Sequence, residues 1–117
     1  MSTTQNFDET ALANISRVGG EDLVQRLIAL FFENAPTRLN DARVGVRCGD
    51  LEAVKRAVHS LKSTAGQLGA VSLQIIAGDI EQFAENDDAA AVSERFRDLA
   101  SALTQAEVYL EEKRKSL

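Results

Sequence analysis

The chain has 117 residues, which suits one domain, and 44% of them are hydrophobic, which is enough for one core. A formal net charge of −5 argues against a nucleic-acid-binding protein, because such proteins normally present a basic face. No apolar run approaches the roughly 20 residues of a membrane span, and the first six residues lack the pattern of a signal peptide. Cys48 is the only cysteine. We expect a single domain over residues 1–117 in the reducing cytoplasm, away from membranes.

The N-terminal part of the chain predicts three helical segments. Asp8 is placed to cap a short helix that ends at Gly19-Gly20. A second helical stripe follows. Pro36 lacks an N–H and disfavours helix before it, so we expect a break near residues 34–36 and a third segment after it.

Three further helices are predicted in the rest of the chain. Asp50 can cap the first of them, and Gly69 fits the left-handed position past its end. The next helix should end near Asn86, and Asp87 or Asp88 can cap the last. Apolar residues of the first of these helices recur every three or four positions, as a core-facing stripe requires: Leu51, Val54, Val58, Leu61, Ala65 and Leu68.

Short connections between helices of similar length favour antiparallel neighbours. The sequence therefore predicts an all-α fold: an antiparallel, up-and-down four-helix bundle with two additional N-terminal helices packed on one end. One bundle accounts for the apolar stripes, so we expect a monomer.

His59 is the only histidine. It follows a core position by one residue, which rotates it about 100° toward solvent. Lys55, Lys62, Ser63 and Gly66 lie four before and three, four and seven after it, so they share one outer strip of the helix. The strip combines a nucleophilic ring, two ammonium groups, a hydroxyl and a glycine. Residues 50–69 carry a net charge of +1 in this acidic chain, which would steer an acidic partner toward the histidine.

The run HSLKSTAGQLG, residues 59–69, resembles the signature of histidine-containing phosphotransfer (HPt) domains. That pattern is a histidine, any residue, an aliphatic residue, a lysine, a small residue and a glycine ten positions after the histidine. Every place is matched, although Ser63 stands where glycine is commonest. The similarity extends to the helix order and the overall length, so it covers nearly the whole chain.

The resemblance implies that His59 accepts a phosphoryl group and that Lys62 neutralises it. It further implies that Ser63 and Gly66 leave room for a receiver domain, with Gly69 in a structural role. The partners would be response-regulator receiver domains and a hybrid sensor histidine kinase. Members of the family lack a kinase ATP site, so the chain would be a phosphocarrier and not an enzyme. It would need no cofactor, since the receiver holds the Mg²⁺.

Some relatives place a glutamine 22 residues after the histidine, where it bonds the imidazole. Glu81 occupies that place here, and Gly78 lies one turn away and would keep the neighbourhood open. A carboxylate there could accept from a ring N–H, but it would also repel phosphate. The sequence leaves open whether Glu81 touches His59.

A lone histidine beside an apolar stripe is usually structural, and Cys48 is more often a small buried filler. A di-metal bundle needs Glu-x-x-His pairs, but Arg56 precedes His59 by three residues. A zinc site lacks ligands. The main alternative is a helical adaptor that binds receivers without phosphotransfer. The start at Met1 suggests a free-standing protein, while the kinase, the receiver and the direction of phosphate flow stay open.

Overall fold

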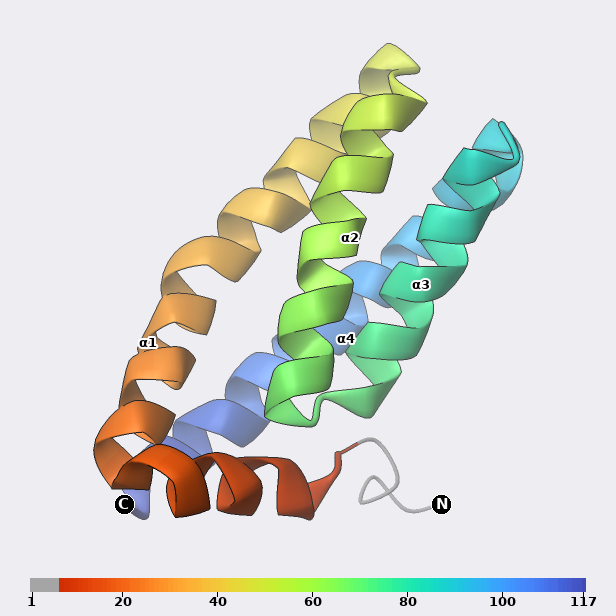
Figure 1. Cartoon of the computed structure of the whole chain (residues 1–117). Coiled ribbons are helices and arrows are strands. Elements are labelled where there is room, and N and C mark those ends of the chain that lie inside the picture. Colours follow the sequence, from red (N-terminus) through yellow and green to blue (C-terminus); the bar gives the residue numbers. More distant parts are fainter. Residues whose placement is uncertain (1–6) are drawn as a thin grey trace.

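Figure 1 shows the computed structural model, which describes residues 7–117. Within those residues the chain forms four helices: α1 (Glu9–Cys48), α2 (Leu51–Leu68), α3 (Val71–Glu85) and α4 (Ala89–Lys115). Each helix runs antiparallel to the one before it, and α4 also contacts α1, so the helices close a bundle. The predicted all-α, up-and-down bundle is confirmed. Residues 1–6, in which the sequence shows no signal-peptide pattern, lie outside the described part of the chain.

α1 takes the place of the three N-terminal segments expected from the sequence. The two additional helices are not found as separate elements within residues 7–117, because α1 runs from Glu9 to Cys48 with one interruption. That interruption is a kink at Gly20, whose φ of 74° and ψ of −176° are open essentially to glycine alone. The expected boundary at Gly19-Gly20 is therefore a change of direction within α1. The residues before it cross beneath the bundle, and those after it run alongside α2 (Figure 1).

The break expected near residues 34–36 is wrong. Pro36 lies inside α1, and Gly20 is the residue at which that helix departs from helical angles. Phe31 and Ala35 before the proline and Ala42 after it are all buried. Both stretches must therefore stay in line to pack on the same core, while the proline ring lies on the exposed side of the helix. Packing on both sides outweighs the local cost of proline.

The helix ends follow the predicted caps. The carboxylates of Asp50 and Asp88 accept backbone N–H groups in the first turns of α2 and α4. Asp88 is thus the cap of α4, and Asp87 before it adopts a φ of 61°. Gly49 and Gly69 take left-handed φ values of 71° and 81° at the ends of α1 and α2. These compact stops keep consecutive helices side by side.

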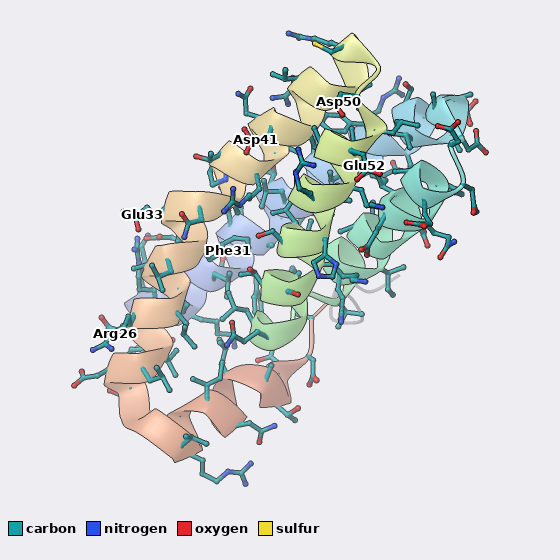
Figure 2. All side chains as sticks on the ribbon, turned by 45° about the horizontal axis from the view of Figure 1, so that its top comes forward. Arg26, Phe31, Glu33, Asp41, Asp50 and Glu52 are labelled. Atoms are coloured by element: carbon teal, nitrogen blue, oxygen red, sulfur yellow. The ribbon has the colours of Figure 1, made fainter. Side chains whose placement is uncertain are left out.

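The core is built from the predicted stripes. In Figure 2, Phe31 of α1 points toward the bundle, whereas Glu33 lies on the outer side of that helix. The α2 stripe is fully buried apart from its first member, Leu51: Val54, Val58, Leu61, Ala65 and Leu68. Cys48 is exposed, contrary to the expectation of a buried filler, because it sits in the last turn of α1 beyond the core. No helix in residues 7–117 is long and apolar enough to cross a membrane.

A short N-terminal arm is attached to the turn between α2 and α3. The Asp8 N–H donates to the Gly69 carbonyl at 2.8 Å, and Phe7 forms an antiparallel bridge with Ala70. The Phe7 ring also stacks on Tyr109 of α4, with 4.0 Å between the ring centroids. The turn between α2 and α3 sets how these two helices pair. The arm therefore links this turn to α4, the last helix of the chain.

We predict that Gly69→Ala destabilises the bundle by more than about 2 kcal/mol. Alanine disfavours the left-handed φ, and its Cβ would lie 2.5 Å from the Asp8 carbonyl oxygen. Gly49→Ala is the matched control, because its φ is similar and no atom lies within 4 Å of the added Cβ. It should cost about 1 kcal/mol. Urea unfolding of both variants measures the difference, and equal costs would contradict the close approach of the arm.

Candidate functional site

His59 lies on the outer side of α2 at the seam with α3. Its side chain is 59% exposed, while Val58 beside it is fully buried. The 100° rotation between consecutive helical residues accounts for this difference. The imidazole is therefore open to a second molecule, as the sequence predicts.

A single carboxylate from α3 contacts both His59 and Lys62. Glu81 Oε2 lies 2.7 Å from His59 Nδ1, and Glu81 Oε1 lies 2.6 Å from Lys62 Nζ. This settles the question that the sequence left open, since Glu81 does touch the ring. An ionised carboxylate can only accept, so Nδ1 carries the proton and donates it. In the neutral ring, Nε2 is left with a free lone pair.

Lys62 holds the pKa of the Glu81 carboxyl below its usual value of 4.5. The hydrogen bond from the ammonium is the largest cause; burial opposes it, and the bond from His59 adds to the lowering. Only 22% of the Glu81 side chain is exposed, so both contacts are partly shielded from water. The carboxylate is consequently ionised at neutral pH.

Gly78 lies beside the stem of Lys62. A Cβ at Gly78 would lie 3.4 Å from Lys62 Cδ, which is an ordinary van der Waals contact, so an alanine could fit at this position. The expectation that Gly78 keeps the neighbourhood open stays a prediction.

Gln74 of α3 lies over Gly66, a neighbour that sequence reasoning missed. A Cβ on Gly66 would come within 2.6 Å of Gln74 Nε2, so the glycine admits a side chain of its own protein. Ser63 is exposed nearby. Lys62, Ser63, Gly66 and Gln74 line a shallow hollow on the surface beside α2. The hollow is open to an incoming group, although part of the space beside Gly66 is already filled.

Lys55 forms ion pairs with two acids. Its Nζ lies 3.0 Å from Glu85 Oε1 and 3.4 Å from Glu52 Oε2. The locally basic helix inferred from the sequence is therefore largely neutralised by carboxylates, because α3 places Glu81 and Glu85 against the two lysines. The attraction of an acidic partner to this face is weaker than the charge of residues 50–69 suggests.

The family model of the Hpt domain matches residues 26–109. The chain belongs to the Hpt domain family. No curated protein matches its sequence. The chain shares its fold with solved structures, among them two of histidine-containing phosphotransfer proteins. Histidine-containing phosphotransfer protein B (HptB) of Pseudomonas aeruginosa PAO1 has a TM-score of 0.89 at 19% identity, and the match covers 96% of both chains. A rice protein assigned as a histidine-containing phosphotransfer protein has a TM-score of 0.62 at 20% identity, with 97% of this chain and 86% of that chain covered.

Glu81 places a carboxylate directly beside the ring of His59. The repulsion of phosphate expected from this carboxylate is moderated, because Lys62 pairs with it. Within residues 7–117, no group of three or more His, Cys, Asp and Glu side chains could hold a metal ion.

We predict that Glu81→Gln lowers the free energy of unfolding by about 1 kcal/mol at pH 7 and by less at pH 3. The native pKa of Glu81 lies below 4.5, so its contribution is present above that pH. It is lost as the pH falls through the native value. Urea unfolding at both pH values measures this dependence. Glu112→Gln, on the exposed side of α4, is the control and should change little at either pH. An equal penalty for Glu81→Gln at both pH values would contradict the ion pair.

Proposed function

We propose that this Hpt chain is a phosphorelay intermediate. His59 accepts a phosphoryl group from a receiver-domain aspartate, or from a hybrid sensor kinase, and passes it to another receiver aspartate. The observation that carries the proposal is an exposed imidazole whose Nδ1 is held by Glu81 and whose Nε2 is free. The whole chain would act as one monomeric domain in the cytoplasm, as a carrier without its own ATP site.

The transfer step follows from the free Nε2. Its lone pair attacks phosphorus in line, and the Nε2–P bond forms as the P–O bond to the donor aspartate breaks. The bonding pair leaves with the aspartate, which becomes a carboxylate, and the ring becomes cationic. In the return step a second aspartate carboxylate attacks phosphorus, and the electron pair of the Nε2–P bond returns to the ring.

Lys62 would stabilise the charge of the transferred group. Its ammonium is a compact charge that suits a phosphoryl oxygen, and it shares the Glu81 carboxylate with the ring that reacts. Mg²⁺ on the receiver would neutralise the remaining charge. Ser63, which is exposed, and Gly66 would leave a low surface on which the receiver can approach.

Replacing the histidine distinguishes the carrier from an adaptor that only binds receivers. We expect the wild type to take label from a phosphorylated receiver and to hold it in an acid-labile, base-stable form. His59→Gln should retain receiver binding and take no label, because it lacks the nucleophile. A receiver panel with mass spectrometry of the labelled residue makes the measurement. Label that persists in His59→Gln, or a wild type that binds receivers without labelling, would overturn the proposal.

Lysine replacements on α2 test the phosphoryl contact. We predict that Lys62→Ala slows transfer about ten-fold or more, because a charge-assisted hydrogen bond is lost. Lys55→Ala is the matched control and should stay within about two-fold, because its ammonium is already held by Glu85 and Glu52. Rapid-quench transfer from a phosphorylated receiver gives both rates. Equal slowing in the two variants would point to general charge and not to Lys62.

A further inference from the structure

Gly66 faces the side chain of Gln74 across the seam between α2 and α3. It lies inside α2 and is not among the glycines with positive φ, so its backbone does not require glycine. Glycine destabilises the interior of a helix relative to alanine. The space beside it supplies a reason, because an added Cβ would lie 2.6 Å from Nε2 and 3.0 Å from Cδ of Gln74. Gly66 therefore seats the Gln74 amide against the backbone of α2.

The seated amide belongs to the shallow hollow beside α2, which contains no acid among its lining residues: Lys62, Ser63, Thr64, Gly66, Gln67 and Gln74. Gln67 and Gln74 are both exposed. Each amide offers two N–H donors and one carbonyl acceptor. The ammonium of Lys62 is already paired with Glu81. The hollow thus presents mainly neutral hydrogen-bonding groups, which match the N–H and C=O groups in the main chain of a partner protein.

The hollow lies within the area that a receiver docked at His59 would cover. His59 and Gly66 are seven residues apart on one strip of α2, which is about 10 Å along the helix. A protein interface of standard size buries about 800 Å² on each partner, a patch that reaches roughly 16 Å from its centre. A receiver that brings its aspartate to Nε2 of the ring therefore extends over the Gln74 amide.

We propose that Gln74 is a specificity-determining residue, whose amide, seated on Gly66, hydrogen-bonds the main chain of a docked receiver. Gly66 then acts through Gln74 and not through a receiver contact of its own. This inference rests on the proposed function and deepens it, since it names a group by which this chain selects among receivers. A receiver whose loop places a main-chain group over the amide gains a hydrogen bond, and one whose loop runs elsewhere does not.

The two possible roles of Gly66 predict different behaviour for a double substitution. A glycine that only leaves room for the receiver would hinder docking when it is replaced by alanine, whether or not Gln74 is present. A glycine that seats Gln74 acts by holding the amide, and alanine displaces that amide at little cost in stability, because it ends a flexible side chain. A double-mutant cycle with Gly66→Ala and Gln74→Ala separates the two roles.

Binding is measured apart from the chemistry, in a His59→Gln background titrated with a panel of receiver domains by isothermal titration calorimetry. Gly66→Ala, Gln74→Ala and their combination are compared with Gln82→Ala, which removes an exposed amide of the same helix that does not line the hollow. With His59 restored, single-turnover transfer over a range of receiver concentrations gives the half-saturating concentration and the maximal rate. Urea unfolding checks that each variant is folded.

We expect Gln74→Ala to weaken the binding of at least one receiver about three-fold to ten-fold, and of others by less than about two-fold. The half-saturating concentration should rise by the same factor. The maximal rate should stay within about two-fold, because the contacts of the ring are intact. Gly66→Ala should give the same pattern, and the double variant should lose no more than either single one. Gln82→Ala should bind every receiver as the parent does.

Additive losses for Gly66→Ala and Gln74→Ala would overturn the inference, because the glycine would then act by itself. A Gln74→Ala variant that binds every receiver as the parent does would overturn it too, as would a lower maximal rate with unchanged binding. Failure of the proposed function looks different: receivers would bind with this dependence on Gln74 but would never label His59. Receivers that neither bind nor label the chain would overturn both.

Discussion

The contact between Glu81 and His59 crosses the seam between α2 and α3, and the candidate chemistry depends on the register of those two helices. A shift of one residue in α3 would rotate the carboxylate by about 100° and remove it from the ring. The register is set by packing, because Leu61 and Ala65 of α2 and Ala77 and Ile80 of α3 are all buried in one core. The core therefore positions the proton on a ring that is itself exposed.

The turn between α2 and α3 adds a second constraint on the same register. Gly69 ends α2 in a left-handed conformation, and its carbonyl accepts from the Asp8 N–H. Phe7 on the other side of this contact stacks on Tyr109, whose hydroxyl pKa is raised to about 12, chiefly by burial. The N-terminal arm thus links α4 to the turn between α2 and α3. This turn is held by the two helices that it joins and by the arm.

Sequence-based prediction succeeded for helix ends that a single residue decides. It failed where tertiary packing opposes the local preference of a residue. The caps at Asp50 and Asp88 and the stop at Gly69 depend on backbone groups close in sequence, so they could be predicted. Pro36 disfavours helix locally, yet buried residues on both sides keep α1 continuous. A sequence pattern records the local cost of proline but not the tertiary contacts that offset it.

The sequence by itself determined the all-helical fold, the apolar faces of the helices and the outward position of His59, because the helical period places residues three and four apart on one face. It also carried the eleven-residue motif that points to phosphotransfer. Only the tertiary structure decided that Glu81 reaches the ring, that Lys62 pairs with Glu81 and that Gln74 fills the space over Gly66. These contacts join residues of different helices, and their distances follow from how α2 and α3 pack, which no local spacing encodes.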